Sequence, residues 1–265
     1  MRGGAQAHLL ECDDGHFYVV KFSNNPQHRR ILTNEWIASV FLDYLQISTP
    51  PTAIVELTPE FLNENSDVHI QLGSRHLGVE PGWHFGSRYP GDPNKLMVYD
   101  FIPDLLLEKV ENRNEFLGIL AFDKWISNAD ARQSIFFRAR LREWSPARER
   151  QPRLGFVTQM LDHGYIFGGP HWSFSDSPLQ GLYFRPVVYR NVRSLDDFEP
   201  WLDRLVHFPD IVFDQAQKQI PPQWLAGDEA ALDALLTKLL ARRRRIPDLI
   251  RDSRHGRVNP FPEWK

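Results

Sequence analysis

Cysteine is nearly absent from this sequence: Cys12 is the only one among 265 residues. An intrachain disulfide is therefore impossible, and so is a metal site built from several cysteine ligands. A single thiol of this kind usually packs as a small apolar side chain in a core, which suits a reducing compartment. The first residues also lack the charged, then apolar, then small-residue pattern of a signal peptide. We therefore expect a cytoplasmic protein.

Long apolar segments and an excess of charge are missing too. No stretch approaches the ~20 apolar residues that span a bilayer, so we expect no membrane contact. A formal net charge of −3 argues against bulk attraction to nucleic acid. The arginine-rich segment 138–153 is expected to form an extended hairpin, solvated or facing an acidic partner. A nucleic-acid-associated protein that uses these arginines is a third, less favoured hypothesis. The histidines show no HxH or HExxH spacing, which disfavours a metal hydrolase.

What is present is enough apolar material for a large core. Hydrophobic residues make up 42% of the chain, and 18 Phe, 8 Trp and 7 Tyr exclude a disordered protein. Patterns typical of strands dominate up to about residue 103, and patterns typical of helices dominate after it. The sequence therefore predicts an α+β protein with two lobes, residues 1–103 and 104–265, and a ligand site in the cleft between them.

Individual elements follow from periodicity and turn residues. Asp13-Asp14-Gly15 predicts a hairpin turn between two strands, and Thr33 or Asn34 would cap the first helix. Residues 73–95, rich in Gly, Pro and His, are expected to form a long loop, in which His84 and Arg88 are secondary candidates for contacting a phosphate or substrate. Strands are predicted at 8–12, 16–22, 53–57, 95–102, 134–137 and 156–161, and helices at 33–45, 115–127, 197–206, 213–219 and 228–250, the last capped by Asp228 and carrying a salt-bridged or solvated arginine run at 242–245.

Two acidic turns in the middle of the chain are the main candidates for chemistry. Asp130 follows the apolar helix and the polar turn Ser127-Asn128-Ala129, and Asp162 ends a strand, with Gly164 two residues later. Carboxylates at such positions suit metal binding and the orientation of a hydroxyl group. Each turn also has an ordinary explanation, because Asx turns and strand-ending loops use the same residues.

Three features upstream suit a phosphate-containing ligand. Gly3-Gly4 lets backbone N–H groups approach phosphate oxygens, although such a pair is often only a turn. Lys21 lies inside an apolar strand, where its ammonium group must reach water or meet an anion. Glu35 lies in the helix expected to pack over that strand. The alternative is an edge-strand lysine and a glutamate that favours the helix dipole.

Together these residues resemble the HipA-like kinase family, whose fold is related to protein and phosphoinositide kinases. The matching stretches are Gly3-Gly4-Ala5-Gln6, Val20-Lys21, Asn34-Glu35-Trp36, Val98-Tyr99-Asp100-Phe101, 122–130 and Leu161-Asp162-His163-Gly164.

The resemblance implies a two-lobed protein-kinase-like fold: a small antiparallel-sheet N-lobe with one main helix, lacking its usual first strand, and a larger, mainly helical C-lobe. It implies Asp130 as the catalytic aspartate and Asp162 as a metal ligand. The residues implied in nucleotide binding are Gly3, Gly4, Gln6, Lys21, Glu35 and the hinge residues Met97, Tyr99 and Phe101.

One departure concerns the metal. Family members usually carry an asparagine five residues after the catalytic aspartate, where this chain has Ile135, so Gln133 or Asn128 is expected to substitute for it. Our leading hypothesis is an ATP- and Mg²⁺-dependent kinase acting on Ser or Thr of a protein whose identity the sequence does not reveal. The alternative is a pseudokinase that binds nucleotide and docks a partner without catalysis.

Overall fold

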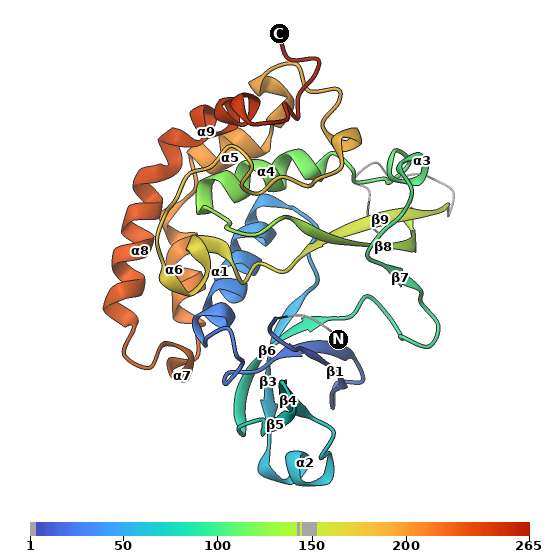
Figure 1. The fold of residues 1–265 in the computed structure, drawn as a ribbon, viewed down its shortest axis with the longest axis vertical. Helices are drawn as coiled ribbons and strands as arrows, with labels where there is room; N and C mark the ends of the chain where they lie inside the picture. Colours follow the sequence, from blue (N-terminus) through green and yellow to red (C-terminus); the bar gives the residue numbers. More distant parts are fainter. Residues whose placement is uncertain (1–3, 142–143, 145–152) are drawn as a thin grey trace.

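The computed structural model describes residues 4–141, 144 and 153–265. One end of the molecule is an antiparallel sheet of four strands, β1 (His8–Glu11), β2 (Phe17–Lys21), β6 (Gly82–Arg88) and β3 (Thr52–Leu57), in the order β1-β2-β6-β3 (Figure 1). The predicted hairpin turn before β2 is confirmed, with Gly15 at a φ of +75°. Cys12 is half-buried at the edge of the cluster under this sheet.

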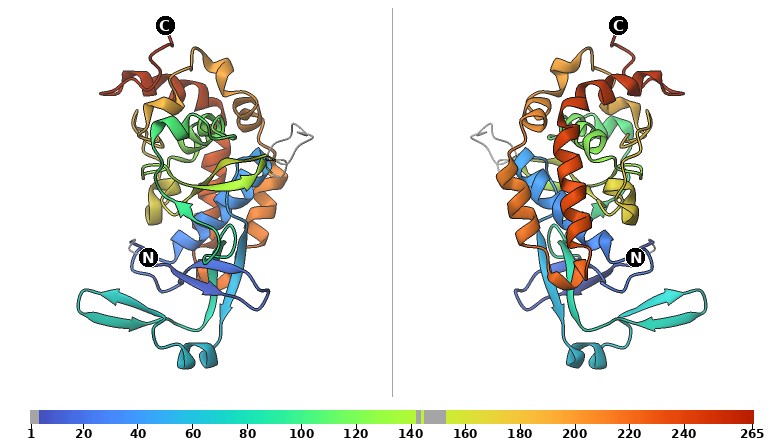
Figure 2. Two further views of the ribbon diagram at one scale, coloured as in Figure 1. Left: turned by 90° about the vertical axis from the view of Figure 1, so that its right-hand side faces the viewer. Right: turned by 90° about the vertical axis from the view of Figure 1, so that its left-hand side faces the viewer.

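The predicted long loop at 73–95 is wrong. The segment contains two strands, β5 (Arg75–Gly78) and the whole of β6. Strand β5 forms a hairpin with β4 (His69–Leu72), and this hairpin projects sideways from the main sheet in both side views (Figure 2). Glycine misled the prediction, because Gly86 is a packing requirement rather than a turn. A Cβ at Gly86 would lie 2.5 Å from Cγ2 of Val55 on the neighbouring strand. Glycine inside a strand often marks such a close approach.

His84 is a structural residue of β6 and does not face a ligand. Its side chain is fully buried, its Nδ1 accepts a hydrogen bond from the Ser23 N–H at 3.0 Å, and its Nε2 lies 3.1 Å from the Glu80 carbonyl oxygen. Burial lowers the pKa of His84 to about 4. Arg88, the other candidate of this segment, is half-buried with a guanidinium nitrogen 3.1 Å from Nδ1 of His16.

His84 should make the protein sensitive to acid. Because its folded-state pKa is about 4 and its unfolded pKa is about 6.5, the unfolded chain binds more protons between these values. Stability is then complete above pH 6.5 and falls as the pH drops toward 4, by about 3 kcal/mol in all. In His84→Gln the amide remains able to hydrogen-bond but cannot titrate. Urea unfolding at pH 7.5 and 4.5 should give a smaller loss for the variant; equal losses would contradict this origin.

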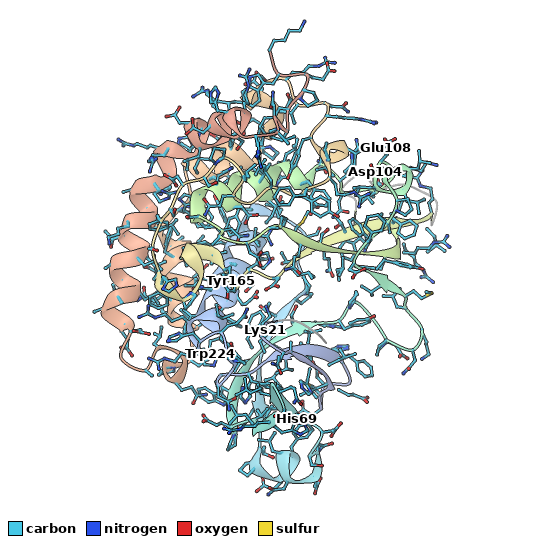
Figure 3. All side chains as sticks on the ribbon, in the orientation of Figure 1. Lys21, His69, Asp104, Glu108, Tyr165 and Trp224 are labelled. Carbon is cyan, nitrogen blue, oxygen red and sulfur yellow. The ribbon has the colours of Figure 1, made fainter. Side chains whose placement is uncertain are left out.

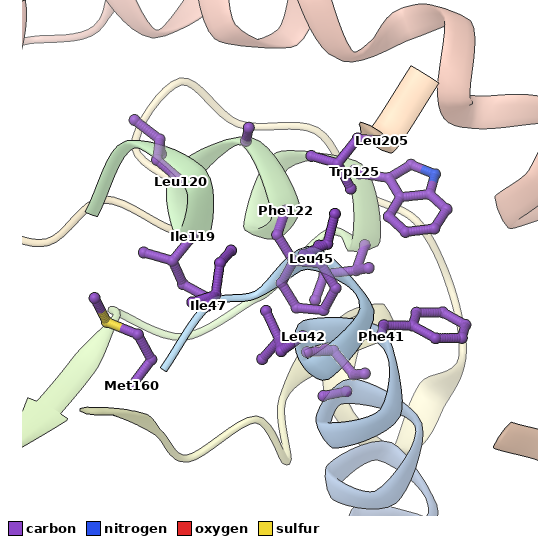
Figure 4. Packing of buried hydrophobic residues seen from close by; sticks show 14 of the residues in the cluster. Phe41, Leu42, Leu45, Ile47, Ile119, Leu120, Phe122, Trp125, Met160 and Leu205 are labelled. Carbon is purple, nitrogen blue, oxygen red and sulfur yellow. The ribbon is translucent and has the colours of Figure 1, made fainter. Parts of the chain in front are cut away.

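Helix α1 (Arg30–Leu45) joins the sheet to the rest of the molecule. It begins one turn earlier than predicted, so Thr33 and Asn34 are buried inside it and do not cap it. Its far end packs against α4 (Glu115–Ile126), where the rings of Phe41 and Trp125 stack with centroids 5.8 Å apart (Figure 4). The largest apolar cluster extends across these two helices, which fixes the position of α1 relative to the catalytic candidates.

A second sheet follows α4. The antiparallel hairpin of β8 (Gln133–Arg140) and β9 (Leu154–Leu161) confirms the two predicted strands and the predicted extended hairpin, whose tip at 142–143 and 145–152 lies outside the described residues. The strand predicted at 95–102 shrinks to β7 (Val98–Tyr99), paired with β8. Arg138 and Arg140 are exposed on β8.

Helices dominate the chain after β9. The predicted long helix at 228–250 is interrupted by a 3-10 turn at Arg243–Arg245, because Pro247 has no N–H to continue the helical ladder. Asp228 stands at the start of α8, but its carboxylate binds Arg30 instead of capping. The arginine run is salt-bridged, as expected. The remaining helices are α2 (Pro59–Glu64), α3 (Asp104–Leu107), α5 (Trp201–Val206), α6 (Asp210–Lys218), α7 (Pro222–Leu225), α8 (Glu229–Arg242) and α9 (Ile246–Asp252).

Within the described residues, none of the helices combines the length and apolar character needed to cross a bilayer.

Candidate active site

Lys21 lies where the four-stranded sheet meets the helical part of the molecule (Figure 3). Its Nζ donates to Oδ1 of Asp162 at 2.8 Å and also to Oε1 of Glu35 on α1. Burial alone would lower the pKa of Lys21, but the two carboxylates outweigh burial and raise it. Three of the residues predicted from the sequence, from three separate elements, therefore form one chain of ion pairs.

The backbone around Asp162 explains how it reaches Lys21. Asp162 follows β9 with a φ of +58°, which turns the chain sharply toward α1. Gly164 passes so close to the helix that a Cβ would lie 2.6 Å from Cγ2 of Ile31. Glu35 accepts the His163 N–H at 3.0 Å through its second oxygen, so one glutamate holds both Lys21 and the turn. Asn34, the residue before Glu35 on α1, donates to the Gly164 carbonyl oxygen at 2.7 Å.

Gln133 completes this group. Its Nε2 donates to Oδ2 of Asp162 at 3.0 Å. Turning the amide by 180° about its last bond would present Oε1 to the same space, so Gln133 and Asp162 together offer the oxygen ligands that Mg²⁺ prefers. The pKa of Asp162 is lowered, because Lys21 and Arg132 outweigh the opposing effect of burial. The carboxylate thus stays ionised, as a metal ligand must.

No group of three or more His, Cys, Asp or Glu in the described ranges could enclose a metal ion. The ligand set at Asp162 and Gln133 instead fits a Mg²⁺ ion that keeps several waters or phosphate oxygens, the usual mode of that ion in phosphotransferases.

Asp130 is presented to solvent on the turn after α4. Ser127 ends the helix with a φ of +57°, and Asn128 beneath it is fully buried. The Asn128 amide donates to Oδ1 of Asp123 at 3.1 Å and accepts the Asp130 N–H at 3.1 Å. Both ends of the amide of Asn128 therefore shape the turn. The Asp130 side chain is exposed, and its Oδ1 accepts the Ala131 N–H at 2.8 Å.

A buried ion pair beneath this turn was not predicted. Asp123 and Arg132 have no exposed side-chain area, and Arg132 donates to both carboxylate oxygens of Asp123, at 2.8 and 2.5 Å. Arg132 also donates to the Leu161 carbonyl oxygen at 2.7 Å and to Nδ1 of His163 at 3.1 Å. The pair thus connects the turn that carries Asp130 to the turn that carries Asp162. An aspartate near the end of a mostly apolar helix is the sequence signal that points to it.

The predicted glycine loop is only partly described. Gly3 lies outside the described residues. Gly4 lies beside Gln27, whose Nε2 would be 2.3 Å from a Cβ at that position. The side chain of Gln6 pairs with the backbone of Gln71 on β4 in both directions, at 2.5 and 2.6 Å, and so is used within the N-terminal part of the fold.

The predicted hinge runs along β8. Tyr99 pairs through its backbone with Phe136, while the side chains of Met97 and Phe101 are 70% and 62% exposed. The Phe101 ring lies under the Arg185 guanidinium at 4.5 Å. A hollow of about 700 Å³ between the end of α1 and 88–90 holds none of the predicted catalytic groups.

Comparison with known proteins shows the family and the fold of this chain. A family model described as HipA-like kinase matches residues 1–136, about half of the chain. Two crystal structures of the Golgi casein kinase, one with Mn/ADP bound, each superpose with a TM-score of 0.51 over 97% of this chain and 72% or 71% of theirs, at 13% and 14% identity. No curated protein matches.

At this low identity the superposition shows the fold alone. It confirms the predicted two-lobed, protein-kinase-like α+β fold. The family match covers Lys21, Glu35 and Asp130 within residues 1–136. The chain belongs to the HipA-like kinase family.

Proposed function

We propose that this protein is an ATP- and Mg²⁺-dependent phosphotransferase that acts on a serine or threonine hydroxyl of a protein. The observation that carries the proposal is the chain of ion pairs from Glu35 through Lys21 to Asp162. A lysine held by a helix glutamate beside a metal-binding aspartate is the arrangement that protein kinases use to position ATP phosphates. The acceptor class is inferred from the family and from the fold it shares with a casein kinase.

The surfaces around Lys21 suit a purine nucleotide. Val19 lies two residues before Lys21 on β2 and so shares its face of the sheet, and Ile135 shares the face of Gln133 on β8. We propose that these two apolar side chains contact the adenine from opposite sides. Ile135, which stands where the family usually has an asparagine, would then be an apolar contact for adenine. Gln133 would take the asparagine's role as an amide ligand of the metal ion.

The residues divide the chemistry among them. Mg²⁺, held by Asp162 and Gln133, would neutralise charge on the phosphates. Lys21 would leave Asp162 for the phosphates while Glu35 keeps it oriented. The acceptor hydroxyl oxygen bonds to the γ-phosphorus as the bond from that phosphorus to the β–γ bridging oxygen breaks, and ADP leaves. Asp130 orients the hydroxyl and takes its proton, which then passes to solvent.

Thermal unfolding with and without MgATP tests the nucleotide and metal assignments. Ligand at one hundred times its Kd should stabilise the wild type by about 2.7 kcal/mol. Asp162→Asn should lose the part of this gain that depends on Mg²⁺, because the amide is a poorer ligand than the carboxylate. Asp214→Asn, on the exposed face of α6, is the matched control. Equal gains in all three proteins would contradict the metal assignment.

A pseudokinase is the second candidate, and one observation favours it. Both oxygens of Asp162 already accept hydrogen bonds, from Lys21 and from Gln133, so the carboxylate has partners without a metal ion. A pseudokinase would show the MgATP stabilisation but transfer no phosphate.

A further inference from the structure

The segment that follows Asp162 is held in place by basic side chains from three elements. Arg30 of α1 donates to the Pro170 carbonyl oxygen at 2.9 Å and lies 4.2 Å over the Trp172 ring. Lys124 of α4 is buried and donates to the carbonyl oxygens of Ser177 and Pro178, both at 2.9 Å. In Figure 1 this part of the chain runs from η2 (Ile166–His171) along the helical body.

Arg242, from the end of α8, makes the strongest connection. It is 7% exposed and donates to the last carbonyl oxygens of α4, those of Trp125 at 2.9 Å and Lys124 at 3.1 Å. The same guanidinium donates to Oδ1 of Asp176 at 2.6 Å and lies 4.8 Å over the Phe174 ring. One buried arginine therefore binds both the helix that leads into the catalytic turn and the segment after Asp162.

The segment also meets the catalytic turn directly. Ser127, three residues before Asp130, donates through its hydroxyl to the Ser175 carbonyl oxygen at 2.8 Å and accepts the Ser175 N–H at 3.0 Å. Residues next to Asp176 thus lie beside the turn that carries Asp130.

We propose that Asp176 and Arg242 are positioning residues for the acceptor, and that they make phosphorylation of the segment unnecessary. Many protein kinases order the corresponding segment only when an added phosphate pairs with arginine. Here the encoded carboxylate of Asp176 already meets two arginines, Arg242 and, at 2.8 Å, Arg245. The inference rests on the proposed function, because it concerns the acceptor of the same site.

Asp176→Asn is the direct test. Removing a charge-assisted hydrogen-bonded pair of this kind should lower kcat/KM for a protein acceptor about tenfold or more. The stabilisation by MgATP should be unchanged, because Lys21 and Asp162 are untouched. Asp176→Glu should recover most of the loss. Asp248→Asn, which breaks the exposed 2.7 Å pair with Arg251 on α9, should change neither quantity.

Two further measurements complete the test. Hydrogen exchange at 173–181 should speed up in Asp176→Asn and not in Asp248→Asn, and this readout needs no catalysis. Phosphatase treatment of the wild type should leave its activity unchanged. A loss of activity after that treatment, unchanged transfer by Asp176→Asn, or unchanged exchange would each overturn the inference. If the wild type transfers no phosphate, the proposed function is wrong, and so is the acceptor role of Asp176. The hydrogen-exchange measurement would still decide whether Asp176 holds the segment in place.

Discussion

Replacing Asp130 by asparagine is expected to lower the rate of phosphate transfer about a thousandfold. The carboxylate is assigned to orient the acceptor hydroxyl and take its proton, and an amide cannot take that proton. The fold should be unaffected, because Asp130 is exposed and an asparagine oxygen can still accept the Ala131 N–H. The backbone N–H that Asn128 binds is unchanged as well.

This result is measured as transfer of labelled phosphate at saturating MgATP, together with nucleotide stabilisation of each protein. Asp214→Asn, equally conservative and far from the turn in sequence, should transfer at the wild-type rate. The role assigned to Asp130 fails if Asp130→Asn keeps more than about a tenth of the wild-type rate, since general-base catalysis is worth at least a hundredfold.

The second large effect concerns stability. Replacing Asp123 by alanine is expected to cost about 3–5 kcal/mol, because Arg132 would remain buried without its counter-charge. The double variant Asp123→Leu/Arg132→Met removes both charges and should be far less destabilised than either single variant. It should nevertheless transfer phosphate poorly, because Asn128 and the Leu161 carbonyl oxygen lose the partners that hold the two turns together.

Urea unfolding of the single variants Asp123→Leu and Arg132→Met, and of the double variant, measures these differences. Additive losses, with the double variant as unstable as the sum of the single ones, would show that the charges do not depend on each other. Wild-type activity in the double variant would show that the pair does not position the turns.

The sequence predicted best those residues whose charged side chains stand within apolar segments. Lys21 in an apolar strand had to meet an anion, and Glu35 and Asp162 are the anions it meets. Gln133, chosen only as a substitute ligand, also lies on Asp162. Which of these residues bind metal or nucleotide stays a prediction, and so does the lobe boundary at residue 103.

Tertiary contacts decided what the sequence could not predict. The pairing of Asp123 with Arg132 depends on the path that the chain takes after the end of α4. Asn34 is buried within α1 instead of capping it, and there it binds the Gly164 carbonyl oxygen. The strand β6 was hidden because Gly86 serves close packing against Val55, and a single sequence gives no sign of that neighbour.

The proposed function requires that this site transfers the γ-phosphate of ATP. It is tested most directly by incubating the wild type and Asp130→Asn with Mg²⁺ and ATP labelled at the γ position, and in parallel with ATP labelled at the α position. Label is expected on protein from γ-labelled ATP only, and only with the wild type. Label from neither nucleotide, with MgATP still raising the melting temperature, would contradict it and identify the protein as a binding module.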